Sequence, residues 1–90
     1  MEHLKIESEF IKILKEIKSQ NRVLSEWREI ESSDMFQSEK YCGGFDSIED
    51  KFTFSYYADK KQEFWFEVIL EEIDKILKGE INNLKVRKSD

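Results

Sequence analysis

The sequence predicts a small α+β domain: an N-terminal helix, a two- to four-stranded antiparallel meander sheet, and a C-terminal helix packed on one sheet face. Three observations support this class. Apolar residues recur with helical spacing near both ends of the chain, a central segment alternates with the period of a strand, and 90 residues are enough for one core. We assign residues 1–80 to a single domain and residues 81–90 to a C-terminal tail or short edge strand.

The first twenty residues have the pattern of an amphipathic helix. Their apolar positions fall within about 100° of a helical wheel, which predicts a helix over about residues 3–20. The next segment, residues 22–31, fits either a second helical piece or a strand. We favour a strand, because Val23, Ser25 and Trp27 would then share one face. The apolar stripe of the first predicted helix, over about residues 3–20, consists of Ile6, Phe10, Ile13, Leu14 and Ile17.

Residues 51–57, KFTFSYY, alternate with period two and give the clearest strand. Residues 63–69 allow two interpretations, a helix capped by Asp59 or a second strand. The β-rich composition favours the strand, paired with the first as a hairpin. A helix then runs from about Leu70 to Lys78 and ends at Gly79, a usual stop position.

This arrangement predicts which aromatic side chains leave the core. If Phe52 and Phe54 face the helices, Tyr57 and Trp65 point to the opposite face, beside Glu67. Aromatic residues within a charged rim are typical of compact protein interfaces. The alternative is that Trp65 lies under the tail or the 22–31 segment as part of the core, because large aromatics in small domains are usually buried.

The charge of the chain is concentrated in its middle. The formal net charge is −5, and residues 21–50 carry eight acidic against three basic side chains. Such a field repels phosphate backbones and attracts a basic protein, so we expect a protein partner and no nucleic acid or membrane. The candidate partner-binding residues are Asp46, Glu49, Asp50, Tyr57, Trp65 and Glu67.

The stretch CGGFDSIED, residues 42–50, matches no standard chemical site. The spacing from Asp46 fails the calcium-loop pattern, no phosphate-binding glycine motif is present, and Cys42 and His3 are the only Cys and His. We interpret Gly43 and Gly44 as a bulge or positive-φ positions before a turn. We expect no catalytic residue, metal or cofactor. Less favoured alternatives are a weak cation site at the acidic turn and a metal-dependent or thiol enzyme that uses Cys42.

No apolar export segment or membrane span is visible, so we expect a cytoplasmic protein. The hypothesis that follows is a small acidic, non-enzymatic interaction protein, such as an inhibitor or immunity-type antidote of a basic toxin or nuclease. The alternative is a homodimeric regulatory or accessory subunit that pairs through the open sheet face or an edge strand.

Overall fold

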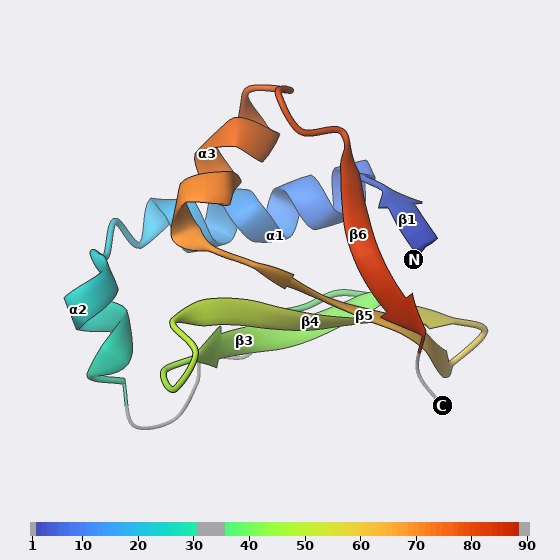
Figure 1. Ribbon diagram of the computed structural model, residues 1–90, viewed down its shortest axis with the longest axis horizontal. Coiled ribbons are helices and arrows are strands. Elements are labelled where there is room, and N and C mark those ends of the chain that lie inside the picture. Colours follow the sequence, from blue (N-terminus) through green and yellow to red (C-terminus); the bar gives the residue numbers. More distant parts are fainter. Residues whose placement is uncertain (1, 31–35, 89–90) are drawn as a thin grey trace.

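The computed structural model describes residues 2–30 and 36–88. In this part of the chain, three helices lie on one side of a six-stranded antiparallel sheet (Figure 1). The helices are α1 (Ser8–Ser19), α2 (Leu24–Arg28) and α3 (Leu70–Leu77). The strands are β1 (Glu2–Lys5), β2 (Phe36–Gln37), β3 (Tyr41–Asp46), β4 (Lys51–Ala58), β5 (Lys61–Val68) and β6 (Asn83–Lys88).

The strand order is β1-β6-β5-β4-β3-β2, with every neighbouring pair antiparallel. The α+β class and the placement of helices on one sheet face are confirmed, but the predicted two to four strands are too few. The β4 and β5 strands and the α3 helix lie where the sequence predicted them. The strands β1, β2 and β3 were not assigned from the sequence, whereas β6 lies in the tail, for which a short edge strand was one alternative. The unassigned strands have two to six residues, and short strands leave little local signal.

The strands at the two ends of the chain depart from the prediction in different ways. Residues 3–5 were expected in the first helix, but they form β1, and α1 begins only at Ser8. The tail was expected to fray or to form an edge strand, whereas β6 lies inside the sheet between β1 and β5. Leu4 pairs with Leu84 across β1 and β6. This contact joins the two ends of the chain, and a periodic pattern in one segment cannot reveal it.

The centre of the core is the ring of Phe10 on α1. Its centroid lies 5.2 Å from Tyr41, 5.2 Å from Phe54 and 5.3 Å from Phe66, on three adjacent strands. The contacts with Phe54 and Phe66 are edge-to-face, a favourable geometry for aromatic pairs. This cluster fixes α1 across the middle of the sheet, with the remaining stripe residues Ile13, Leu14 and Ile17 also buried.

A second aromatic cluster surrounds Trp27, which is 1% exposed. Its ring lies 5.1 Å from Phe52, 5.7 Å from Phe45 and 6.2 Å from Phe36. The prediction of a strand over residues 22–31 is therefore wrong: residues 24–28 are a short helix. The expected shared face does not exist either, because Val23 is 59% exposed while Trp27 is buried.

The glycine pair lies within a regular strand. Gly43 pairs with Phe54 and Gly44 with Thr53, and the positive-φ glycine among the described residues is Gly79, at 81°. The predicted bulge or positive φ is therefore wrong. The requirement at Gly43 is space, because a Cβ there would clash with the carbonyl oxygen of Thr53 and lie 2.6 Å from Cδ1 of Phe54.

We predict that Gly43→Ala destabilises the protein by about 3 kcal/mol, at the upper end for overpacking, because the backbone carbonyl cannot yield as a side chain can. Urea denaturation measures this. Gly79→Ala is the control, where nothing lies within 4 Å of the added Cβ. Its cost should be only about 1 kcal/mol, from the positive φ. Equal costs at the two positions would contradict the steric explanation.

Candidate protein-binding site

Three segments that are distant in sequence meet at one end of the domain. They are residues 22–30 with α2, residues 46–51 at the β3–β4 turn, and residues 67–72 at the β5–α3 junction, on the left in Figure 1. Together they carry eight acidic and three basic side chains, a net charge of −5 that equals the charge of the whole chain. We call these residues the acidic end.

The other end of the long axis is nearly neutral. Residues 2–5, 39–40, 58–63 and 83–88, together with Glu7 and Glu9, which contact Lys40, carry seven basic against six acidic side chains, a net charge of +1. They lie on the right of Figure 1, and the long axis of the domain measures 33 Å. The domain is therefore electrostatically polarised, and a basic partner would approach the acidic end first.

The β3–β4 turn at the acidic end is held by side chains. The carboxylate of Asp46 accepts hydrogen bonds from the N–H groups of Ile48 and Glu49, at 2.9 and 3.3 Å. Arg28 of α2 donates two hydrogen bonds to the carboxylate of Asp50, at 2.8 and 2.5 Å. This paired geometry is the strong form of an ion pair, and the hydrogen bond from Arg28 lowers the pKa of Asp50. The turn is thus tied to α2.

A lysine links the turn to the neighbouring strand. The Nζ of Lys51 lies 2.7 Å from a carboxylate oxygen of Glu67 on β5 and 3.7 Å from one of Glu49. The hydrogen bond with Glu67 raises the pKa of Lys51, so the ammonium stays charged at neutral pH. Lys51 therefore forms ion pairs with both Glu67 and Glu49, and these three side chains together carry a net negative charge.

The acidic end also carries the exposed apolar residues of the domain. Ile48 at the tip of the turn is 90% exposed, Val23 is 59% exposed and Ile69 is 40% exposed, and the described residues include no other exposed large hydrophobic side chain. Single exposed apolar residues are ordinary, but three at one end of a small domain indicate a contact surface.

Two of these apolar residues stand where helices prefer a polar side chain. Val23 and Ile69 are the N-cap residues of α2 and α3, and neither gives a side-chain capping hydrogen bond. The reverse half of the capping box is present: carboxylates of Glu26 and Glu72 accept the N–H groups of Val23 and Ile69, at 3.2 and 3.0 Å. Apolar N-caps forgo about 1 kcal/mol each relative to Ser, Thr, Asp or Asn.

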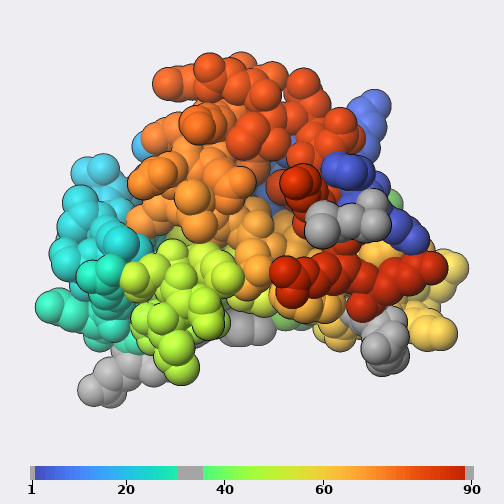
Figure 2. Space-filling view, viewed as in Figure 1, coloured from blue at the N-terminus to red at the C-terminus, as the bar shows by residue number. Residues whose placement is uncertain are grey.

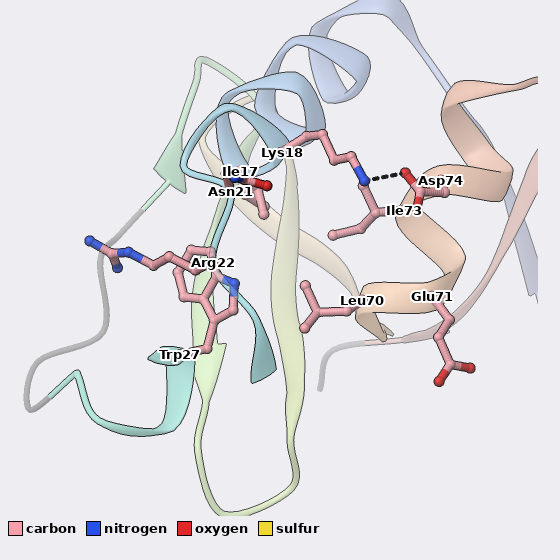
Figure 3. Close-up of a pocket in the computed structure, with 9 residues that line it drawn as sticks. All are labelled: Ile17, Lys18, Asn21, Arg22, Trp27, Leu70, Glu71, Ile73 and Asp74. Atoms are coloured by element: carbon pink, nitrogen blue, oxygen red, sulfur yellow. Dashed lines mark ion pairs between the residues drawn. The ribbon is translucent and has the colours of Figure 1, made fainter. Parts of the chain in front are cut away.

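A cleft of about 240 Å³ opens between α1, α2 and α3 (Figure 3). One side is closed by an ion pair in which Nζ of Lys18 lies 2.7 Å from a carboxylate oxygen of Asp74. Arg22 covers the ring of Trp27 at 5.1 Å from its centroid. The cleft is lined by Ile17, Lys18, Asn21, Arg22, Trp27, Leu70, Glu71, Ile73 and Asp74.

The structure brings four of the six predicted binding residues together. Asp46, Glu49 and Asp50 lie in the β3–β4 turn, and Glu67 is connected to them through Lys51. Their carboxylates take part in local hydrogen bonds and ion pairs. The residues of the acidic end that sequence reasoning missed are apolar: Val23, Ile48, Ile69 and the cleft residues Trp27 and Leu70.

The two predicted aromatic residues lie outside the acidic end. Trp65 is on the open sheet face, paired in register with Ser55 and Arg87, and it is half-buried because the Arg87 guanidinium lies 4.9 Å from its ring centroid. Tyr57 is at the far end of β4, where its N–H donates to the carbonyl of Lys40 at 2.7 Å. Trp65 thus lies on the sheet face that the sequence predicted, and Arg87 of β6 partly covers it.

The missed residues had a weak signal in the sequence. Ile48 is an apolar residue inside a polar turn. Val23 and Ile69 begin the patterns V-x-x-E and I-x-x-E, in which the first position of a capping box is normally Ser or Thr. An apolar side chain at a cap or turn tip has little chance of burial by its own element. Such violations of local preference can therefore point to surface contacts.

Residues 2–30 and 36–88 contain no group of three or more His, Cys, Asp or Glu side chains that could hold a metal ion. In the same residues no helix has the length and apolar character needed to cross a membrane.

Comparison of the chain with protein-family models, with curated proteins and with solved structures gives no match.

We predict that Asp50→Asn lowers stability at neutral pH but not in acid. The folded-state pKa of Asp50 lies below the ordinary 3.8, so its pairing with Arg28 stabilises the fold above pH 3.8 and is lost as pH falls through the folded-state pKa. Asparagine tolerates the positive φ of 57° at this position. Thermal melts across pH 2–7 test this. Asp59→Asn, also at positive φ, is the control, and the same pH profile there would contradict the assignment to the Arg28 pair.

We predict that Val23→Ser raises the free energy of unfolding by about 0.5–1 kcal/mol, because the serine hydroxyl completes the capping box that Glu26 half forms. Chemical denaturation measures the change. A matched Ser25→Val substitution, at an exposed position within α2, should not stabilise the protein. A loss of stability in Val23→Ser would show instead that the valine holds α2 in place.

Proposed function

We propose that this chain is a small protein-binding domain that uses its acidic end to bind a basic protein. The observation that carries the proposal is the coincidence, at one end of the fold, of the entire net charge of −5 and all three exposed large hydrophobic side chains of the described residues. Charge of one sign steers and orients a partner, while apolar side chains supply contact energy.

The local energetics support a role in binding. Three apolar residues occupy positions where polar residues would stabilise the turn or the helix N-terminus. Proteins commonly depart from local preferences where function requires it, and stability is lowered in return. The ordered turn also favours binding, because residues that are fixed before association lose less entropy on contact.

The kind of partner follows from the charge. Proteins that bind or cleave nucleic acids carry basic surfaces that contact phosphates. An acidic domain with apolar anchors can cover such a surface and compete with the nucleic acid. The proposed role is therefore that of an inhibitor or immunity-type antidote of a basic toxin or nuclease, acting by occlusion and without chemistry of its own.

The partner chemistry can be tested with a phage-displayed library of random short peptides selected on the purified protein. We expect enriched peptides to combine Lys or Arg with large apolar residues, and their affinity to fall as salt is raised. Charge reversal at two exposed acids of the acidic end, Glu29→Lys with Glu71→Lys, should weaken binding about tenfold or more. Ile48→Asp should weaken it as well, although it adds negative charge, because it removes an apolar contact.

Matched variants separate this site from general charge effects and from the open sheet face. Glu39→Lys with Glu63→Lys makes the same charge change at exposed positions of the opposite end of the long axis and should leave affinity nearly unchanged. Trp65→Ala tests the open face and should also have little effect. The proposal is wrong if no basic peptide is enriched, or if both double variants weaken binding equally.

A further inference from the structure

The tip of the β3–β4 turn carries an isoleucine that has almost no packing role in the domain. Ile48 is 90% exposed, the highest value among the exposed large hydrophobic side chains of the described residues. Because it buries so little surface on folding, its apolar character contributes almost nothing to the stability of the fold. Turn positions are usually occupied by polar residues or glycine, which suit the contact with water better. Ile48 is therefore available in full for a contact outside the domain.

The backbone that presents Ile48 is fixed before any partner arrives. The carboxylate of Asp46 accepts hydrogen bonds from the N–H groups of Ile48 and Glu49, so it holds the tip itself. The other side of the turn is held from α2, where Arg28 donates two hydrogen bonds to the carboxylate of Asp50. A side chain on an ordered support loses less entropy on binding, so more of its contact energy appears as affinity.

Carboxylates surround the isoleucine at the tip. Residues 46–51 carry three acids and one base, a net charge of −2. Glu49 follows Ile48 directly in the chain, and its side chain is 60% exposed. A partner surface that contacts Ile48 is therefore within reach of negative charge, and Lys or Arg on that surface would complement it.

The shape of the turn indicates the shape of the partner surface. In Figure 2, the atoms of the turn lie at the surface in yellow-green, next to α2 at the lower left. A side chain at a projecting tip touches a flat surface only with its end, whereas a recess encloses it on several sides. Contact energy grows with the apolar area removed from water, and anchors enclosed in pockets carry most of the affinity of an interface. A recess is the partner feature that uses Ile48 most fully.

We infer that Ile48 is the anchor of the interface and enters an apolar recess on the partner, where Lys or Arg at the rim contact Glu49 and the other carboxylates of the turn. The domain supplies the projecting group and the partner supplies the pocket. Val23 and Ile69 lie at the same end but are less exposed, and they contribute smaller contacts. This inference rests on the proposed function, since it names the anchor of the acidic end and the kind of surface that receives it.

The probe for the test is the tightest basic peptide selected on the wild-type protein, from a library that includes loops closed by one disulfide. A closed loop can form a concave surface. Ile48→Ala should weaken peptide binding about tenfold or more, and Ile48→Val about three- to fourfold, in line with the number of carbon atoms removed. Val23→Ala and Ile69→Ala are matched controls at the same end, and each should change affinity less than about twofold. Thermal melts of Ile48→Ala should match those of the wild type, because the side chain is exposed.

A larger side chain distinguishes a recess from a flat contact. Ile48→Trp adds apolar area, so a flat partner surface would bind this variant as tightly as the wild type or more tightly. A recess that fits isoleucine is overfilled by an indole, and the affinity should then fall about fivefold or more. Retained or increased affinity of Ile48→Trp would show that no recess encloses the residue.

A second readout uses the wild-type protein without a substitution at the tip. In a sample with labelled isoleucine methyl groups, titration with the peptide should shift the Ile48 resonance most. The resonance of Ile81, a partly buried isoleucine between α3 and β6, should stay in place. The spectrum of Ile48→Val assigns the Ile48 signal.

The outcomes separate the inference from the proposed function. If the peptide binds with strong salt dependence, but Ile48→Ala retains full affinity and the Ile48 resonance does not shift, the anchor inference is wrong and the acidic end remains the binding site. A larger loss in Val23→Ala or Ile69→Ala than in Ile48→Ala also overturns it. If no basic peptide is selected at all, the proposed function fails, and the inference fails with it.

Discussion

The packing of Trp27 against Phe36, Phe45 and Phe52 is the contact on which the acidic end depends. Helix α2 has five residues, too few to be stable alone, and Trp27 is its one buried residue. Burial of a single indole therefore fixes both the conformation and the position of α2. From that position Arg28 reaches Asp50, Arg22 covers the outer face of the ring, and one wall of the cleft is in place.

The separation of charge between the two ends of the domain follows from the antiparallel pairing of the strands. Alternate connections of a meander lie at the same end of the sheet, so the β3–β4 turn and the β5–α3 junction are neighbours while the β4–β5 turn is at the far end. The acids of residues 46–51 and 67–72 are thereby gathered beside α2. Insertion of β6 between β1 and β5 places Arg87 and Lys88 beside Trp65 and Phe64, away from the β5–α3 junction. An acidic end and a nearly neutral opposite end result from charges that are mixed along the chain.

Local preferences are broken at the same end of the fold where charge accumulates. Apolar residues cap α2 and α3 and form the tip of a turn, although each could be replaced by a polar residue that suits the backbone better. The stripe of α1, the alternation of β4 and the stop at Gly79 agree with their structures, while Lys60 in the β4–β5 turn has a positive φ of 64°. The coincidence of two apolar N-caps and an apolar turn tip with the accumulated charge is what makes the acidic end a functional candidate.

Local patterns in the sequence predict the class, the stripe of α1, the β4–β5 hairpin, α3 and the acidic turn, because periodicity, turn chemistry and charge are local properties. Contacts between distant segments set the remaining features. The alternating pattern predicted one shared face for Val23 and Trp27, but Val23 is exposed and Trp27 is buried. The reason is that three aromatic rings from other segments contact Trp27 and set the conformation of α2. Strand β6 is interior because residues at the start of the chain pair with it. The cleft and the surrounding cluster of acids exist only where distant segments meet, and no local pattern encodes that meeting.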